Sequence, residues 1–177
     1  MIFLKGKKVY LRPVTERDLK GDYLNWINDP ENDVFTDHAL FAHDPKSLKE
    51  FRSLKQDDKR SLWLAIIEIK TGKHVGNIEL TAINWVHKTG EYKILIDKKY
   101  SGKGYGFEAS TLILAHGFHK LNLERIQLGV NAENKPAIFL YKKLGFVKEG
   151  VLRGAFLRHG KRQDVIIMGL FRKEFKD

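Results

Sequence analysis

Ser101-Gly102-Lys103-Gly104-Tyr105-Gly106 is the most informative stretch of this 177-residue sequence. It lies between an expected strand, residues 91–96, and a long expected helix, residues 105–121. Glycines let a backbone turn tightly against a ligand, and the first N–H groups of a helix attract anions. The stretch therefore predicts a phosphate-binding or pyrophosphate-binding turn, with a plain glycine-rich turn as the alternative. Its spacing is that of neither the dinucleotide fingerprint nor a P-loop.

A second motif, Asn131-x-x-Asn134-x-x-Ala137, precedes Tyr141 and Gly145-Phe146. On a helix that begins near Pro136, Ala137 and Tyr141 are one turn apart and share a face. Asn134 stands at the N-cap, where its side chain can accept a helix N–H or bind a ligand amide. Capping by Asn134 and core packing of Tyr141 are the alternatives to ligand binding.

The remaining pattern predicts one α/β (α+β) domain over residues 1–177, with a mixed sheet. Expected strands over residues 61–69, 74–82 and 91–96 predict an antiparallel meander, and residues 146–157 and 164–171 predict a closing hairpin. Leu62–Ile67 and Val165–Phe171 are apolar runs typical of buried strands. Thr15 and Asp44 are expected N-caps. Helical spacing then predicts one helix through Leu19, Tyr23 and Ile27, and a second with a buried stripe of Leu48, Phe51 and Leu54.

Composition excludes several classes of protein. The chain is 42% hydrophobic and 31% charged, and it has no cysteine, which excludes disulfides, zinc–thiolate sites and a cysteine nucleophile. Its seven histidines form no ligand set, so we expect no metal. The sequence shows no secretory leader and no apolar run of about 20 residues, so we expect a cytoplasmic protein without membrane contact.

The net charge of +10 raises three classes of partner: nucleic acid, an anionic membrane or a phosphorylated small molecule. Basic residues are spread through every segment and alternate with acidic ones, and no nucleic-acid motif accompanies them. Nucleic-acid binding is therefore not favoured, and a solvated basic surface is the simpler interpretation.

The glycine turn, the Asn-rich motif and Leu140-Tyr-Lys-Lys-Leu-Gly-Phe146 together resemble the GNAT superfamily of acetyl-CoA-dependent N-acetyltransferases. Leu11-Arg12-Pro13 with Asp18-Leu19 is similar to that family's first strand and helix. The branch it resembles is the ribosomal-protein (RimJ/RimL-like) and polyamine branch. Ile83-Asn-Trp-Val-His87, Glu91-Tyr-Lys-Ile-Leu-Ile96 and Leu121-Asn-Leu123 are similar to bacterial spermidine N-acetyltransferases.

The resemblance implies a single GNAT-like domain with a central sheet of about seven strands and about four helices. It also implies a V-shaped splay of the sheet at the cofactor site, acetyl-CoA as acetyl donor, and a homodimer or higher homo-oligomer. The cofactor-binding residues it implies are Ile94, Leu95, Ile96, Ser101, Gly102, Lys103, Gly104, Tyr105, Gly106, Asn131, Asn134, Ala137 and Tyr141.

Catalytic roles follow from the chemistry that the resemblance implies. An amine attacks a thioester only when neutral, and an alkylammonium has a pKa of about 10, so the site needs a base and an acid for the leaving thiolate. We expect Tyr141 to be the acid and Glu91 a base acting through water, with Glu79 as the second candidate. Substrate-binding residues are expected to be Glu79, Trp85, His87 and Glu91, whereas Trp26 is expected in the core.

The expected reaction is direct attack of a small-molecule primary amine on acetyl-CoA, through a tetrahedral intermediate. The amine belongs to a polyamine such as spermidine or to a nucleotide-linked amino sugar; the alternatives are N-terminal acetylation of a protein, or a non-catalytic acyl-CoA-sensing or nucleic-acid-binding module. Two departures from the family matter: Ser101 replaces the usual Gln or Arg, and residues 34–44 are only weakly acidic where polyamine acetyltransferases carry an acidic cluster.

Overall fold

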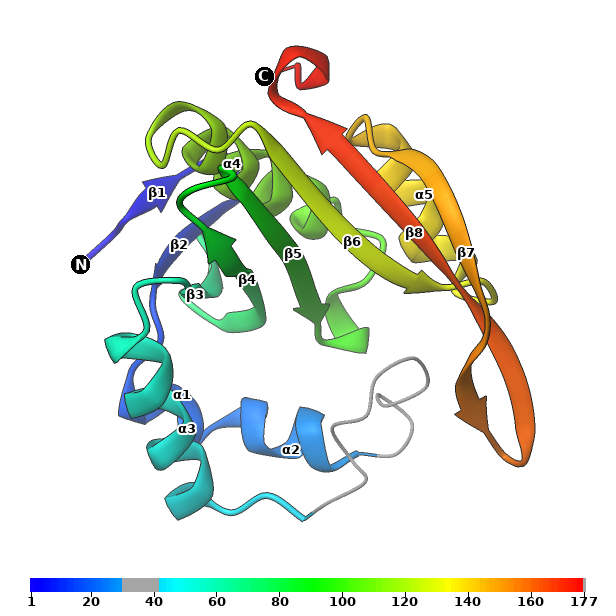
Figure 1. Ribbon diagram of the computed structural model, residues 1–177. Coiled ribbons are helices and arrows are strands. Elements are labelled where there is room, and N and C mark those ends of the chain that lie inside the picture. Colours follow the sequence, from blue (N-terminus) through cyan, green and yellow to red (C-terminus); the bar gives the residue numbers. More distant parts are fainter. Residues whose placement is uncertain (30–41, 177) are drawn as a thin grey trace.

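A computed structural model describes residues 1–29 and 42–176, and these form one eight-stranded sheet (Figure 1). The strand order is β1-β2-β3-β4-β5-β6-β8-β7. The strands are β1 (Leu4–Lys5), β2 (Val9–Pro13), β3 (Leu62–Glu68), β4 (His74–Asn84), β5 (Thr89–Ile96), β6 (Arg125–Asn131), β7 (Val147–Arg158) and β8 (Lys161–Phe171). The strand beyond the expected seven is β1, whose two residues are too short to show an alternating pattern.

The sheet is mixed, as expected. Strands β1 to β5 pair antiparallel in sequence order, and β6, β8 and β7 pair antiparallel at the other side. Within residues 1–29 and 42–176, the two halves join only where β5 runs parallel to β6, at Thr89↔Arg125, Gly90↔Ile126 and Glu91↔Gln127. Beyond these three pairs β5 and β6 diverge, which confirms the expected V-shaped splay.

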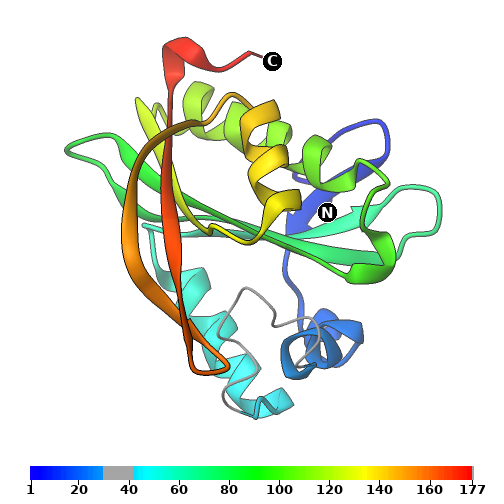
Figure 2. The ribbon, with the colours of Figure 1, turned by 90° about the vertical axis from the view of Figure 1, so that its right-hand side faces the viewer.

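Helices cover both faces of the sheet (Figure 2). In the described part of the chain they are α1 (Glu16–Leu19), α2 (Asp22–Asn28), α3 (Pro45–Asp57), α4 (Tyr105–His119) and α5 (Lys135–Lys143). Figure 2 shows α4 and α5 on one face and α1, α2 and α3 on the other. Within residues 1–29 and 42–176, no helix has the length and apolar character needed to cross a membrane.

Two helix expectations were wrong in part. The helix expected to run from the Thr15 cap through Ile27 is two helices, because α1 ends at Leu19 and Gly21 has a non-helical backbone conformation at the N-cap of α2. In α3, Asp44 caps the helix and Leu48 is buried, but Phe51 is 41% exposed and Leu54 is 72% exposed. The buried stripe is therefore limited to the first turns of α3.

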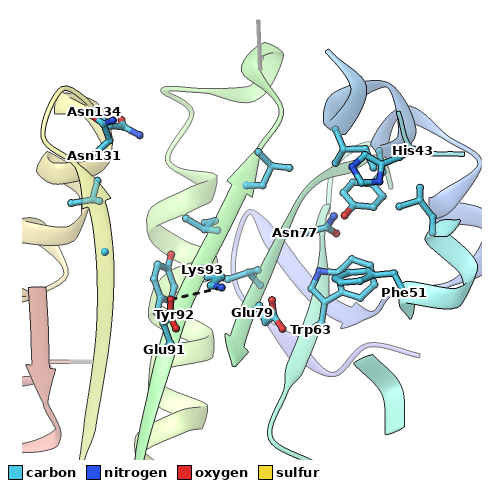
Figure 3. A pocket seen from close by; sticks show the side chains of 18 of the residues that line it. His43, Phe51, Trp63, Asn77, Glu79, Glu91, Tyr92, Lys93, Asn131 and Asn134 are labelled. Carbon is cyan, nitrogen blue, oxygen red and sulfur yellow. Dashed lines mark ion pairs between the residues drawn. The ribbon is translucent and has the colours of Figure 1, made fainter. Parts of the chain in front are cut away.

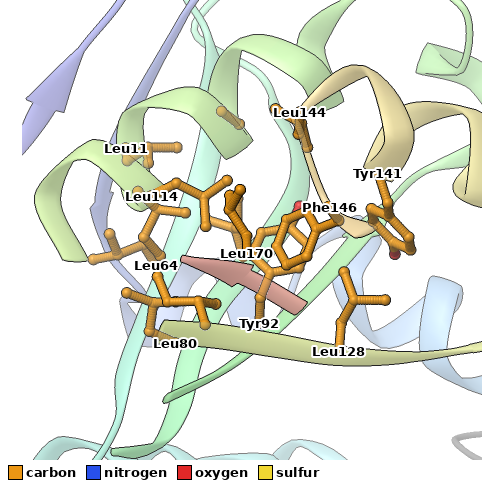
Figure 4. Packing of buried hydrophobic residues seen from close by; sticks show 14 of the residues in the cluster. Leu11, Leu64, Leu80, Tyr92, Leu114, Leu128, Tyr141, Leu144, Phe146 and Leu170 are labelled. Carbon is orange, nitrogen blue, oxygen red and sulfur yellow. The ribbon is translucent and has the colours of Figure 1, made fainter. Parts of the chain in front are cut away.

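Buried apolar residues lie on both sides of the sheet. The larger cluster packs beneath α4 and α5 and includes Leu80, Tyr92, Tyr141 and Phe146 (Figure 4). The smaller cluster packs beneath α1 to α3 and contains Trp26, which is 5% exposed, so its expected place in the core is confirmed. Residues of both hydrophobic clusters therefore border the space between β5 and β6.

A buried ion pair ties β2 to α1. Arg12 donates from both terminal nitrogens to Asp18, at 2.6 and 2.7 Å, and the Thr15 N–H and hydroxyl donate to the same carboxylate at 2.7 Å. Burial by itself raises the pKa of Asp18, but the hydrogen bonds from Arg12 and Thr15 outweigh burial and lower this pKa to about 2. Asp18 is therefore charged in the folded protein throughout the neutral range.

We expect Asp18→Asn to lower the free energy of unfolding by about 2 kcal/mol at pH 7, because the folded pKa lies below the unfolded value of about 3.9. The stabilisation from the charged Asp18 carboxylate is complete above about pH 5 and is lost as the pH falls toward the folded pKa. Urea unfolding of the variant and the wild type at pH 7 and pH 3 measures it, and the difference should shrink by about half at pH 3. An equal difference at both pH values would show that the carboxylate charge is not the source.

Candidate active site

The splay leaves two strand edges facing each other. Among the described residues, β5 pairs only with β4 after Glu91, as far as Ile96, and β6 pairs only with β8 after Gln127, as far as Asn131. Backbone N–H and C=O groups on such edges can pair with an extended ligand that carries amides. Ile94, Leu95 and Ile96, expected from the sequence to hold a cofactor arm, lie on the free edge of β5.

A cavity of about 700 Å³ occupies the splay (Figure 3). Side chains from β3, β4, β5, β6, α2, α3 and α5 line it. Of the residues expected from the sequence to form the site, the cavity brings together Glu79, Glu91, Ile94, Leu95, Asn131, Asn134 and Tyr141. Ile96, Ala137 and the glycine turn lie outside its lining.

Alternation along β5 sends neighbouring side chains to opposite faces of the sheet. Tyr92 packs in the core beneath α4 and α5, where its ring lies edge-on to that of Tyr141 at 5.9 Å between centroids. Glu91 therefore points to the face that carries α1 to α3. Since Glu91 and Tyr141 both line the cavity, the cavity is reached by a carboxylate from one face and a phenol from the other.

Tyr141 is a buried hydroxyl that stays protonated. It is 9% exposed, and burial raises its pKa to about 12. A phenol with that pKa is neutral over the whole neutral range and can donate a proton or a hydrogen bond. Tyr92, another buried phenol of the cavity lining, is instead engaged with Ser110, at 2.5 Å between the oxygens.

Glu91 and Glu79 differ in how freely they face the cavity. The Glu91 side chain is 37% exposed, with the Lys93 ammonium 3.7 Å away (Figure 3). Glu79 is 8% exposed and its carboxylate accepts hydrogen bonds from the Lys55 ammonium and, at 2.6 Å, from the Ser61 hydroxyl. Glu91 is therefore the more open of the two carboxylates to water and to a substrate.

A buried polar chain, which sequence reasoning missed, reaches the cavity at Asn77. The His74 Nε2 lies 2.9 Å from the Asn77 Oδ1, and the other ring nitrogen lies 3.6 Å from Asp18. Burial lowers the pKa of His74, and the Asp18 charge opposes this in part. Within the described residues the Asn77 Nδ2 has no partner, although Asn77 is 5% exposed. No short motif surrounds Asn77, so sequence reasoning had no signal for it.

The glycine turn follows β5 through a short 3-10 helix, Lys98–Tyr100, and opens α4. Gly102 and Gly104 have φ angles of 76° and 82°, a left-handed conformation that favours glycine. The first N–H groups of α4 have no carbonyl partner within the helix. The Lys8 ammonium, which sequence reasoning also missed, lies 3.2 Å from the Lys103 carbonyl oxygen. Open backbone, free amides and a lysine suit a phosphate group at this turn.

The side chains of Asn131 and Asn134, the asparagines of the second motif, make hydrogen bonds within the protein. The Asn134 Oδ1 accepts from the Ala137 N–H at 3.1 Å, which confirms it as the helix cap. Asn131 donates to Gln163 at 2.7 Å and accepts from the Glu133 N–H at 2.8 Å. Both side chains nevertheless reach the cavity beside β6 (Figure 3).

Trp85 and His87 do not join the site. Both lie on the turn between β4 and β5, where the Asn84 side chain accepts from the His87 N–H at 2.9 Å, and Trp85 is 49% exposed. The cavity lining includes neither residue. The reason is the parallel pairing of Thr89 to Glu91 with β6, which closes the sheet at this end. Residues 34–41 of the weakly acidic stretch lie outside the described residues.

These features define a class of protein. A free strand edge can hold an extended amide-bearing arm, a glycine turn can hold its phosphate end, and a carboxylate and a phenol line the cavity where its other end would lie. This is the arrangement of an acyltransferase that uses a coenzyme A thioester. Groups of three or more side chains suited to a metal ion are absent from the described residues.

Comparison with known proteins names the family. Residues 8–147 match the family described as acetyltransferase (GNAT) domain. The spermidine N(1)-acetyltransferase of Escherichia coli (strain K12) is 32% identical over 169 residues, which covers 94% of this chain and 88% of the relative. The chain belongs to the GNAT acetyltransferase family, and it is an enzyme whose acetyl donor is acetyl-CoA.

Solved structures agree with this assignment. The spermidine N-acetyltransferase from Vibrio cholerae, in complex with CoA and spermine, superposes with a TM-score of 0.87 at 28% identity and covers 94% of this chain and 97% of that one. A dodecameric structure of the Vibrio cholerae enzyme superposes with a TM-score of 0.80 at 28% identity, with 94% and 95% covered.

Proposed function

We propose that this chain acetylates a primary amine of a polyamine such as spermidine, in the cytoplasm and as a homo-oligomer. The observation that carries the proposal is the cavity in the splay, which Glu91 and Tyr141 reach from opposite faces of the sheet. The names of the similar proteins support the acceptor: the Escherichia coli relative and the Vibrio cholerae enzyme are both spermidine N-acetyltransferases, and the latter has been solved with CoA and spermine and as a dodecamer.

On the donor side, acetyl-CoA supplies an acetyl thioester on a long amide-bearing arm. Ile94, Leu95 and Ile96 offer the free edge of β5 to that arm, and the N–H groups there can also face the thioester carbonyl. The amides of residues 101–106 and the Lys8 ammonium hold the pyrophosphate. Asn131, Asn134 and Ala137 form the β6 and α5 side of the arm's path.

On the acceptor side, Glu91 takes a proton from the substrate ammonium through an ordered water, which leaves the amine neutral. The amine nitrogen then bonds to the acetyl carbon, and the tetrahedral intermediate that forms collapses as its carbon–sulfur bond breaks. Tyr141 donates its proton to the departing sulfur, and its raised pKa of about 12 keeps that proton in place until then. The nitrogen gives up its second proton to the Tyr141 oxygen once that oxygen has protonated the sulfur, which restores the phenol. Lys55 and Ser61 already occupy the carboxylate of Glu79, which favours Glu91 as the base.

The proposal predicts rapid release of CoA thiol when acetyl-CoA is mixed with spermidine or spermine. The assay panel also contains a nucleotide-linked amino sugar, an aminoglycoside and short peptides with free N-termini, and a sample without amine sets the background. We expect polyamines to give a kcat/KM at least about tenfold above the other amines, a difference of about 1.4 kcal/mol. A higher kcat/KM for the amino sugar or the peptides would show that the acceptor is not a polyamine. Absence of thiol release with every amine, in a protein that still binds acetyl-CoA, would contradict the proposal.

A further inference from the structure

A lysine of the protein itself is paired with the buried carboxylate of the acceptor side. Lys55, in the last turn of α3, reaches Glu79 on β4, and both side chains are largely buried, at 21% and 11% exposed. Ser61 holds the same carboxylate oxygen. The charge of Glu79 is therefore balanced from within the protein before any substrate arrives.

The surroundings of this carboxylate have the composition of an ammonium site. Trp63 lies opposite Glu79 in the β3–β4 pairing, and its ring meets that of Phe51 at 5.4 Å between centroids. The Lys55 ammonium lies 5.4 Å from the centre of the Phe51 ring. A carboxylate beside aromatic rings attracts an organic cation by charge and by cation–π contact. Phe51, Trp63 and Glu79 all line the cavity (Figure 3).

The position of this site relative to Glu91 suits a second amine of one substrate. Glu79 pairs with Lys93 and Glu91 pairs with Thr81, so the two glutamates are diagonal neighbours on one face of adjacent strands. Such neighbours lie about 7–8 Å apart at their Cα atoms. The propyl and butyl segments of spermidine separate its nitrogen atoms by somewhat less than this, a difference that the glutamate side chains can close.

We infer that Lys55 occupies the subsite for the second ammonium of the acceptor and thereby limits the enzyme's preference for diamines and polyamines over monoamines. This inference rests on the proposed function. An acceptor with one amine needs only the region of Glu91, whereas a longer acceptor gains the Glu79 contact only by displacing the Lys55 ammonium. Removing Lys55 leaves a buried carboxylate without a counter-charge, a state that a substrate ammonium relieves.

The test is Lys55→Met, assayed with acetyl-CoA against butylamine, putrescine and spermidine. We expect kcat/KM to rise about tenfold for putrescine and spermidine, equivalent to about 1.4 kcal/mol, and to stay within about twofold for butylamine. The double variant Lys55→Met/Glu79→Gln should lose this gain, because the subsite then has no charge. Lys49→Met removes a charge from the same helix at an exposed pair with Glu16, so it controls for net charge and should behave like the wild type.

A second readout measures binding without turnover. Spermidine should raise the Tm of Lys55→Met by more than it raises the Tm of the wild type, since it replaces the missing counter-charge. If Lys55→Met raises kcat/KM equally for butylamine and spermidine, or lowers kcat/KM for all three amines, the inference is overturned. Lys55 is then only a structural partner of Glu79. If no variant acetylates any of the amines, the proposed function fails, and equal spermidine-dependent Tm shifts would then overturn the inference separately.

Discussion

Replacing Tyr141 by phenylalanine should lower kcat about 1,000-fold, within the range typical of a lost general acid. The thiolate of CoA would then leave without a proton from the protein. Because burial raises the pKa of Tyr141 to about 12, the wild-type hydroxyl is protonated throughout the assay range, and the loss should be the same from pH 6 to pH 10. Thiol release under saturating acetyl-CoA and spermidine measures it.

Two controls separate chemistry from folding. Calorimetric titration should give an acetyl-CoA affinity within a few-fold of the wild type, because the ring that packs against Tyr92 and Phe146 is kept. Tyr10→Phe removes a hydroxyl from β2, outside the cavity lining, and should leave kcat unchanged. Full turnover in Tyr141→Phe would remove Tyr141 as the acid, and a loss that grows with pH would point to a different titrating group.

Replacing Glu91 by glutamine should lower kcat/KM about 100-fold at pH 7, and the loss should shrink toward about tenfold near pH 10. A free alkylammonium has a pKa of about 10, so at neutral pH nearly all of the acceptor carries the proton that the base must remove. Near pH 10 about half of the amine is already neutral and needs no base. The pH profiles of kcat/KM for spermidine, measured for variant and wild type, give this comparison.

Glu124→Gln is the matched control, since this glutamate lies 3.4 Å from Arg172 at a half-exposed position outside the cavity lining. Its pH profile should follow the wild type. An equal loss for Glu91→Gln at all pH values would make Glu91 a positioning residue for the ammonium. A pH-dependent loss in Glu79→Gln but not in Glu91→Gln would transfer the role of base to Glu79.

Local patterns predicted most of the elements. The Asp44 and Asn134 caps, with proline at the following positions, begin α3 and α5 where expected. The meander and the closing hairpin follow from short strand-like runs separated by turn residues, with continuous apolar runs in β3 and β8. Patterns failed where they were short or where neighbours overrode them: β1 has two residues, Gly21 divides the first helical region, and Leu54 faces solvent.

Prediction of the site was uneven for a related reason. Some residues of contiguous motifs, such as Tyr141 and Asn134, reach the cavity, whereas Ala137 and the glycine turn lie outside its lining. Trp85 and His87, chosen for their types and for nearness in the sequence to Glu91, lie at the closed end of the sheet. Lys55, Asn77 and Lys8 belong to no motif. Lys55 and Lys8 each contact a residue far along the chain, and Asn77 lines the cavity.

By itself the sequence determined the type of most elements, the tight glycine turn before α4 and the family, because these depend on neighbours within a few residues or on short motifs. Only the tertiary structure decided which groups face one another. The divergence of β5 and β6 after three residue pairs opens the cavity, and the packing of α3 against β3 and β4 places Lys55 on Glu79. Contacts of that kind arise when distant segments meet, and no local pattern of residues encodes them.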